Sequence, residues 1–183
     1  MKKKPVSSAL SPEYVLLGFL LQRPAHGYDL HEQIDRELGQ IWRISLSQTY
    51  NILKRLETKG FIVGVVQEQE KAPARRRFRL TAVGRRRFEE WLKTPSEPSA
   101  RAIRVEFLTR LYFSYITDPH TAQQLIELQL SATRDAVANL TTLLGELPTE
   151  QAFNQLGLDL RLRQLTSVLE WLAECRAILG FEP

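Results

Sequence analysis

The chain has 183 residues, of which 43% are hydrophobic and 25% are charged, a composition typical of a folded globular protein rather than a disordered one. It contains no apolar run of the roughly 18 residues that a membrane span needs, and its apolar segment near the N-terminus lacks the small-residue cleavage site of a signal peptide. The single cysteine, Cys175, excludes an intramolecular disulfide and a cysteine-rich zinc site. We therefore expect a cytoplasmic protein.

Charge divides the chain into two unlike halves. Residues 1–93 carry 18 Lys and Arg against 10 Asp and Glu, a net charge of +8, whereas residues 94–183 carry 7 against 11, a net charge of −4. A basic half joined to an acidic half indicates a polyanionic partner for the first half only. The alternative is chance variation in surface composition, which charge alone does not exclude.

Two short helices are predicted first. Ser11 and Pro12 suit the N-cap and the first position of a helix whose apolar residues extend over 14–21. After Gly27, apolar residues at helical spacing predict a second helix over 28–38, which Gly39 would end.

A third helix is predicted over 48–59, with Ser47 as its N-cap and Gly60 at its end. At about 100° per residue, its apolar residues fall on one side of the helix. The opposite side is small, polar and basic, and it holds no acid at its centre. It comprises Ser47, Asn51, Lys54, Arg55 and Thr58, flanked by Gln48 and Tyr50.

Two strands and a fourth helix should follow. The β-branched run "FIVGVVQEQ" predicts a strand, "EKAPA" a turn, and "RRRFRLT" a returning strand on which Phe78 and Leu80 face one side. Thr81 is expected to cap a helix over 82–93. The residues of this helix expected to cover the core are Val83, Phe88, Trp91 and Leu92.

The second half of the chain predicts long helices. The segment "TPSEPSA", residues 94–100, is a proline-rich linker. Helices are predicted over 101–116, about 119–147 and about 149–180, with Asp118 and Thr149 as caps.

Two of these helices carry an alternating three- and four-residue apolar spacing, which is typical of helices packed side by side. One seam is Ile126, Leu130, Thr133, Val137, Leu140, Leu144 and Leu147; the other is Leu158, Leu162, Leu165, Leu169, Leu172, Arg176 and Leu179. Pro148 breaks the chain between them, so the two helices should be antiparallel. Apolar residues outside the seams are Leu125, Leu128, Leu143, Leu156, Leu160 and Trp171. We expect this surplus to pack against a second subunit; the alternative is that it covers the first domain of its own chain.

Three helices followed by a two-stranded hairpin is the order of a winged helix-turn-helix. We therefore predict a mainly α fold: a winged helix-turn-helix DNA-binding domain over 1–93, with a three-helix core and a two-stranded β-wing, a linker over 94–100, and a long-helix dimerisation domain over 101–183. A two-fold dimer would place two recognition helices on half-sites about one DNA turn apart. The operator would then be an imperfect palindrome.

The third helix and the hairpin supply the candidate contacts to double-stranded DNA. Gln48, Asn51 and Arg55 are of the types that pair with base edges, whereas Ser47, Tyr50 and Lys54 are better placed for phosphates. The basic residues of the hairpin, Lys71, Arg75, Arg76 and Arg77, would contact the backbone or reach the minor groove. The alternatives are a solvated helix face and charges that protect an exposed strand edge.

Three segments resemble the PadR family of bacterial transcriptional regulators: "LLGFLLQRPAHGYDLHEQI", "WRISLSQTYNILKRLETKGFI" and "RRRFRLTAVGRRRFEEWL". The His-Gly-Tyr at 26–28, the "TY…LKRLE..G" block and the "F.LT..G" pattern carry the resemblance over about residues 13–93. The region from "EFLTRLYF" onward resembles the helical dimerisation region of the virulence-activator-like branch. Asn51 departs from the pattern, because many members have proline there. The resemblance implies that Tyr28 and Tyr50 contact the DNA backbone; the alternative for Tyr28 is core packing.

No catalytic or cofactor-binding pattern accompanies these features. The three histidines, His26, His31 and His120, lack metal-ligand spacing, and no phosphate-binding loop or nucleophile motif is visible. A small-molecule effector pocket where the two halves meet is a further hypothesis, with Trp42, Trp91 and Trp171 as candidate lining residues and core packing as the alternative. We predict a homodimeric, sequence-specific transcriptional regulator, with repression as the expected direction. The alternative is a protein-interaction adaptor that does not bind specific DNA.

Overall fold

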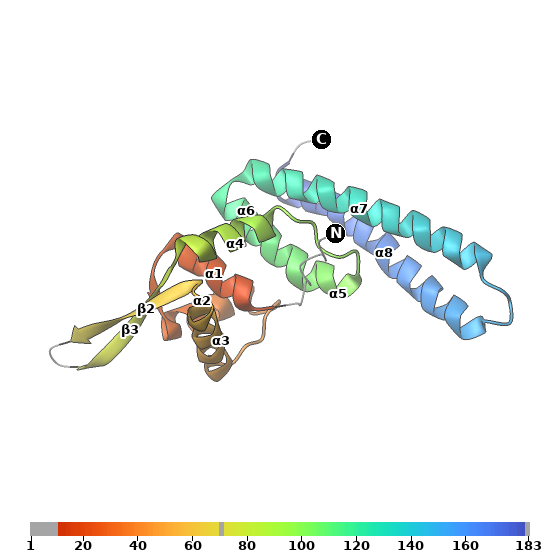
Figure 1. Cartoon of the computed structure of the whole chain (residues 1–183). Helices are drawn as coiled ribbons and strands as arrows, with labels where there is room; N and C mark the ends of the chain where they lie inside the picture. Colours follow the sequence, from red (N-terminus) through yellow and green to blue (C-terminus); the bar gives the residue numbers. More distant parts are fainter. Residues whose placement is uncertain (1–10, 70–71, 182–183) are drawn as a thin grey trace. The chain divides into compact units, whose positions relative to one another are not determined.

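The computed structural model describes residues 11–69 and 72–181, with the backbone alone for 67–69 and 72–75. The described chain is mostly helical and contains a small antiparallel sheet (Figure 1). It divides into two compact units, the first ending at Thr94 and the second beginning at Pro95. The predicted mainly α, winged helix-turn-helix fold class is confirmed.

The first unit, which we call the winged unit, contains four helices among its described residues. They are α1 (Glu13–Gln22), α2 (Gly27–Leu38), α3 (Leu46–Thr58) and α4 (Ala82–Leu92). Helix α1 is apolar almost all round and lies at the centre of the core, where Leu16, Leu17 and Phe19 are at most 1% exposed. Each large apolar side chain removed from water in this way contributes about 1.5–3 kcal/mol to folding. The core therefore fixes the helices that carry the candidate site.

Three strands form the sheet of the winged unit, in the order β1-β3-β2: β1 (Ala25–His26), β2 (Ile62–Gln69) and β3 (Ala72–Leu80). Strands β2 and β3 form the wing, with Ile62 opposite Leu80. The structure differs from the prediction in two places. The sheet has a third strand, β1, whose Ala25 pairs with Phe78. Residues 72–74, predicted as turn, belong to β3.

Helix α4 is attached to the end of the wing by Thr81 and Gly84. The Thr81 hydroxyl donates to the Gly60 carbonyl at 2.8 Å and accepts from the Gly84 N–H at 3.0 Å, which confirms the predicted cap. A Cβ on Gly84 would lie 2.0 Å from the Phe61 carbonyl oxygen, so only glycine permits this close approach. The prediction for Val83 was wrong: it is 49% exposed, because it lies on the side of α4 away from the core.

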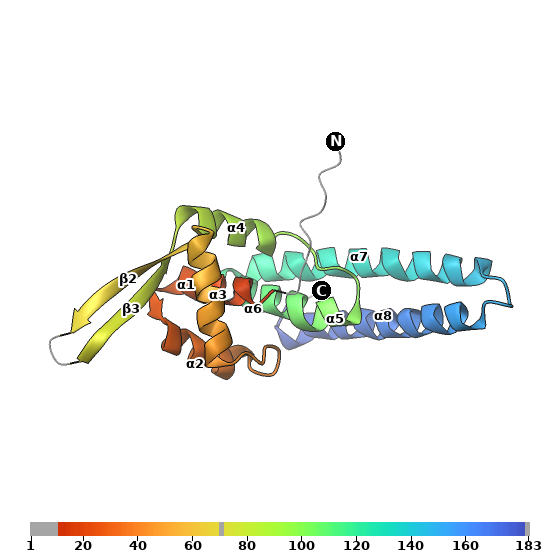
Figure 2. The same cartoon turned by 60° about the horizontal axis from the view of Figure 1, so that its bottom comes forward.

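The second unit, which we call the helical unit, contains α5 (Ala100–Ala102), a π-helical turn η1 (Ile103–Phe107), α6 (Leu108–Thr117), α7 (Pro119–Glu146) and α8 (Ala152–Ile178). Helices α7 and α8 lie side by side and antiparallel, as predicted (Figures 1 and 2). Asp118 caps α7 by accepting from the N–H groups of His120 and Thr121. Hydrogen bonds from the Thr121 hydroxyl and the His120 N–H lower the pKa of Asp118.

The start of α8 differs from the prediction. Its N-cap is Gln151, which makes no side-chain cap bond, and Thr149 lies before the helix. The predicted seams are partly buried between the helices, and Ile126, Leu130 and Leu172 are at most 3% exposed. These residues belong to a core completed by η1, α6 and Cys175. Burial raises the pKa of the Cys175 thiol to about 11, so the thiol is protonated at neutral pH.

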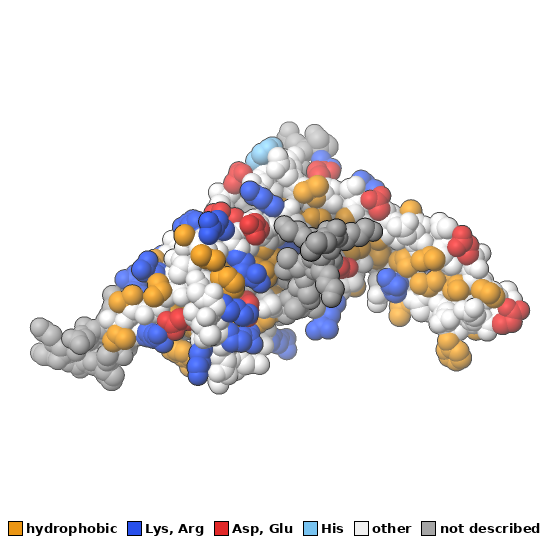
Figure 3. Space-filling model, in the orientation of Figure 1, with side chains coloured by type: hydrophobic (Ala, Val, Ile, Leu, Met, Phe, Trp, Pro, Cys, Tyr) orange, Lys and Arg blue, Asp and Glu red, His pale blue; other side chains and the backbone are white. Residues whose placement is uncertain are grey.

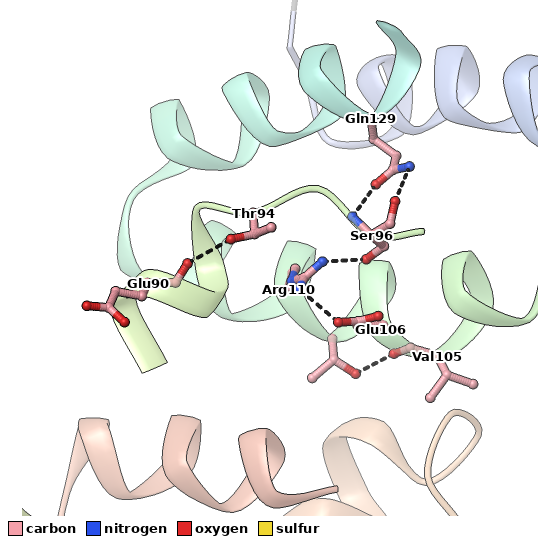
Figure 4. Close-up of polar contacts among 8 residues, drawn as sticks. Glu90, Thr94, Ser96, Val105, Glu106, Arg110 and Gln129 are labelled. Atoms are coloured by element: carbon pink, nitrogen blue, oxygen red, sulfur yellow. Dashed lines mark hydrogen bonds and ion pairs between the residues drawn. The ribbon is translucent and has the colours of Figure 1, made fainter. Parts of the chain in front are cut away.

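A buried polar cluster ties the start of the helical unit to α6 and α7 (Figure 4). The Arg110 guanidinium donates to Glu106 and to the Ser96 hydroxyl, both at 2.7 Å. The Gln129 amide pairs with the Ser96 backbone, accepting at 2.9 Å and donating at 3.1 Å. Because an isolated buried charge is costly, this reciprocal bonding stabilises the conformation in which Ser96 is held.

The apolar residues outside the seams have two different environments. Leu125 is 2% exposed and Trp171 packs edge-on against Phe107 at 6.1 Å, so both belong to the core of their own unit. The prediction that these two side chains pack against a second subunit was therefore wrong, because η1 and α6 cover that side of the α7–α8 pair. The other four, Leu128, Leu143, Leu156 and Leu160, are 50–64% exposed.

Candidate nucleic-acid interface

Helix α3 lies at the front of the winged unit in the view of Figure 2. The residues of its polar face are exposed. Its apolar face, with Ile52, Leu53 and Leu56, is at most 4% exposed. Lysine and arginine side chains gather on the winged unit in the view of Figure 3, whereas hydrophobic side chains are prominent along the α7–α8 hairpin.

The N-terminus of α3 is fixed by a capping box. The Ser45 hydroxyl accepts from the Gln48 N–H at 3.2 Å, and the Gln48 side chain accepts from the Ser45 N–H at 2.8 Å. The prediction of Ser47 as the cap was therefore wrong, because the reciprocal bond needs glutamine three residues after the serine. Ser47 lies exposed in the first turn. Gln48, predicted to contact a base, already uses its side-chain oxygen within the chain.

The predicted DNA contacts whose side chains are described are all exposed. They are Tyr28, Ser47, Gln48, Tyr50, Asn51, Lys54, Arg55, Arg76 and Arg77. The exposed fraction of Tyr28 is 53%, which does not fit the alternative of core packing. Its hydroxyl donates to Glu32, and this hydrogen bond raises the pKa of Tyr28. Which of these residues contact DNA stays a prediction.

Gly27 positions the ring of Tyr50. A Cβ on Gly27 would lie 2.6 Å from Cε1 of Tyr50, so the ring occupies the space that any larger residue would fill. The buried Gly27 begins α2, and Tyr50 projects from α3 with an exposed fraction of 46%. The glycine of the His-Gly-Tyr motif therefore sets the place of a candidate DNA-contacting side chain.

Arg76 of the wing is held against α3. Its guanidinium donates to Glu57 Oε1 at 2.7 Å, and its Cζ lies 5.6 Å from the centre of the Phe78 ring. Glu57 Oε1 also accepts from the N–H of Gly64 in β2 at 2.9 Å. An open groove runs between α3 and the base of the wing, and its lining is Tyr50, Asn51, Lys54, Glu57, Thr58, Arg76 and Phe78.

The other basic residues of the wing differ from Arg76. The Arg77 guanidinium donates to the Pro24 carbonyl at 3.2 and 3.3 Å, away from the groove lined by Arg76. The backbone of Arg75 pairs with Gln67, and its side chain lies outside the described residues. Lys71 also lies outside them.

Glu13 is an acid at this surface that the sequence did not single out. Its carboxylate accepts from Lys59 Nζ at 3.0 and 3.3 Å and lies 3.4 Å from Arg55 Nε. Its side chain is 9% exposed, compared with 57% for Arg55. Arg55, predicted to contact a base, is therefore already paired with a carboxylate of its own chain. The signal was the acid in the first turn of α1, but its partners lie more than 40 residues away.

The three tryptophans have ordinary packing environments. Trp91 stacks on Tyr14 with ring centroids 4.4 Å apart, inside the winged unit. Trp42 is half-buried in the segment that follows α2, where its backbone N–H donates to the Leu38 carbonyl. Trp171 contacts Phe107 in the helical unit. An effector pocket lined by these residues stays a prediction.

The described residues lack two features of other classes of protein. Among these residues, no group of three or more His, Cys, Asp or Glu is arranged to hold a metal ion. In the same part of the chain, every helix is too short or too polar to cross a membrane.

Three packed helices, a β-wing and an exposed basic face on the third helix define a winged helix-turn-helix protein. The model of the "Transcriptional regulator PadR-like family" matches residues 16–90, and that of "Virulence activator alpha C-term" matches residues 103–180. Residues 16–90 thus form a PadR-like family domain, and residues 103–180 are similar to the C-terminal region of virulence activators. This family consists of DNA-binding regulators and not of enzymes.

Individual proteins resemble the chain along most of its length. The "Negative transcriptional regulator PadR" of Bacillus subtilis is 29% identical over 128 residues, covering 70% of each chain. The crystal structure of Bacillus subtilis PadR in complex with operator DNA is 26% identical, covers 91% of this chain and 98% of its own, and gives a TM-score of 0.46. The crystal structure of a PadR-like regulator from Bacillus cereus is 24% identical, covers 98% of this chain and 99% of its own, and gives a TM-score of 0.41.

Proposed function

We propose that this regulator is a repressor that binds an imperfect palindromic DNA operator as a homodimer. The exposed polar and basic face of α3 carries the proposal, because all the described side chains predicted to contact DNA are accessible on it or beside it. The Bacillus subtilis relative is named a negative transcriptional regulator, which supports repression as the direction of control.

In the proposed complex, α3 enters the major groove with its N-terminal part toward the base edges. Asn51 is a type of residue that pairs with adenine, and Arg55 a type that pairs with guanine. Tyr50 and Lys54 would contact phosphates, which fix the position of the protein rather than the sequence. Each neutralised phosphate releases counterions, so affinity should fall steeply with salt.

The exposed apolar surface of the helical unit supports the homodimer. Leu128, Leu143, Leu156 and Leu160 are 50–64% exposed, and Phe153 is 89% exposed. Apolar surface gathered on one pair of helices is typical of an interaction site. A two-fold dimer would present two copies of α3 to half-sites roughly 34–36 Å apart.

Titration of the purified protein onto its own upstream region and onto random duplex of equal length, at two salt concentrations, tests this function. We expect clear preference for one duplex and a loss of affinity at the higher salt. Equal binding to both duplexes would rule out a sequence-specific regulator.

Four variants test the site assignment. Tyr50→Ala and Arg76→Ala should weaken binding to all sequences. Changes at Asn51 or Arg55 should alter base preference, by about 1–3 kcal/mol per base pair that loses its contact. Selection from a random DNA pool measures preference, and titration measures affinity. Wild-type behaviour in all four variants would contradict the assignment.

A further inference from the structure

We propose that Glu57 is a positioning residue that holds the Arg76 guanidinium in the groove beside α3, so that the wing arginine and the recognition helix act on one stretch of DNA. The inference rests on the proposed function and deepens it. Glu57 belongs to the "LKRLE..G" block, and no role in DNA binding follows from its position on the edge of the polar face.

A single carboxylate oxygen connects three elements. Glu57 projects from α3, and its Oε1 accepts from the Gly64 N–H of β2 at 2.9 Å and from Arg76 Nη2 of β3 at 2.7 Å. The Glu57 side chain is 25% exposed and that of Arg76 is 52% exposed. The pair therefore fixes one end of the guanidinium while leaving the rest of it accessible to a ligand.

The space for the Arg76 side chain is provided by Gly64. A Cβ on Gly64 would lie 2.5 Å from Arg76 Nε and 3.0 Å from a ring carbon of Phe78. The arginine thus crosses the strand where β2 has no side chain, and its Cζ lies over the Phe78 ring. Carboxylate, glycine and aromatic ring together form a cradle for this one arginine.

The backbone of Arg76 is fixed as well. Its carbonyl lies 3.1 Å from Nδ1 of His26. Because successive residues of a strand point to opposite faces, Arg77 faces the other way and contacts Pro24. Arg76 and Arg77 should therefore have different effects on binding, although they are neighbours in the sequence.

The negative charge of Glu57 could have the opposite effect on DNA affinity, and the two effects can be distinguished by measurement. A carboxylate close to DNA repels phosphates, so a Glu57 that only competed with DNA would weaken binding. A long arginine side chain loses much rotamer freedom on binding, and a guanidinium that is already placed loses less. Glu57→Gln removes the charge and keeps the size of the side chain, so it separates the two effects by the direction of the change.

The test is a double-mutant cycle on the duplex that the wild-type protein selects from a pool of genomic fragments. We expect Glu57→Gln to weaken binding to this duplex by about 5- to 20-fold, and to add no loss when Arg76 is already alanine. Gly64→Ala should give the same pattern. Glu37→Gln removes the same charge from an exposed pair on α2 and should leave affinity unchanged.

Two results would overturn the proposal. Tighter binding of Glu57→Gln would make the carboxylate a competitor of DNA, and an undiminished loss in the Arg76→Ala background would make it a structural residue of the wing. Unfolding curves for each variant identify a loss that arises from folding.

A measurement without DNA separates this proposal from the proposed function. The Arg76 Nη2–H signals in NMR should exchange slowly with solvent in the wild type, where Nη2 donates to Glu57, and quickly in Glu57→Gln. If the wild type bound all duplexes equally, the proposed function would fail while these signals still decided whether Glu57 positions Arg76. Fast exchange in both proteins would contradict the positioning.

Discussion

The winged unit and the helical unit are stabilised in different ways. In the winged unit, short-range devices place each element: a capping box at Ser45, a threonine cap at Thr81 and a close glycine contact at Gly84. In the helical unit, one side of each long helix packs into the core, and large apolar residues such as Phe153 are exposed to solvent. The most exposed large apolar side chain of the described residues, Phe153 at 89%, thus belongs to the helical unit.

A pair of phenylalanines provides the strongest test of this contrast. Phe88 in the winged unit is 0% exposed, and Phe153 in the helical unit is 89% exposed. Phe88→Ala should lower the free energy of unfolding by about 3–5 kcal/mol, because it leaves a cavity. Phe153→Ala should change the unfolding of a single chain by less than about 0.5 kcal/mol. Urea unfolding at low protein concentration measures both, and equal losses would contradict the comparison.

The proposed dimer can be broken from the exposed side of α8. Leu156→Glu combined with Leu160→Glu should convert the dimer to a monomer, since charge would be buried at the interface. DNA affinity should fall by about 100-fold, because the two half-sites are no longer bound together. Sedimentation gives the mass and titration gives the affinity.

The control for that experiment adds the same charge elsewhere on the helix. Thr166→Glu with Ala173→Glu changes exposed residues on another side of α8. This variant should remain a dimer. A monomeric wild type, or a dimeric Leu156 and Leu160 variant, would remove the support for this interface.

Two serines two positions apart test how α3 begins. Ser45→Ala removes the hydroxyl of the capping box and should cost about 0.5–2 kcal/mol of stability. Ser47→Ala changes an exposed residue in the first turn and should have little effect on unfolding. Thermal unfolding of the two variants compares them directly. Equal costs would mean that the capping box does not determine the start of the helix.

The smallest expected effect concerns Glu13. Glu13→Gln frees Arg55 and Lys59 from their ion pairs and should raise affinity for DNA about two- to fivefold at low salt. The increase in affinity should become smaller as salt is added, since salt screens the interactions between exposed charges. Glu37→Gln is again the control. Unchanged affinity at every salt concentration would show that Glu13 does not compete with DNA for these residues.

Local sequence signals predicted much of the fold. The Thr81 and Asp118 caps, the polar face of α3 and the antiparallel α7–α8 pair all follow from patterns within a few turns of the chain. The Ser45 cap was also visible in principle, because Gln48 stands three residues later. Two serines close together made the wrong choice possible.

Contacts between distant residues explain what the sequence did not predict. Strand β1 is two residues long and exists only because β3, about 50 residues later, pairs with it. Leu125 and Trp171 belong to the core because a third helical segment covers them. The candidate site is similar: the exposed side chains followed from helical periodicity, but Glu13 and Glu57 were missed because their partners come from other elements.

Gly27 has a consequence for how this protein tolerates mutation. A single added methyl group there would displace the ring of Tyr50 from the surface of a different helix. A genetic screen for loss of the proposed DNA binding should therefore recover substitutions at Gly27, a buried position. Conversely, a screen for restored DNA binding in a Gly27 mutant should recover substitutions of Tyr50 by smaller residues.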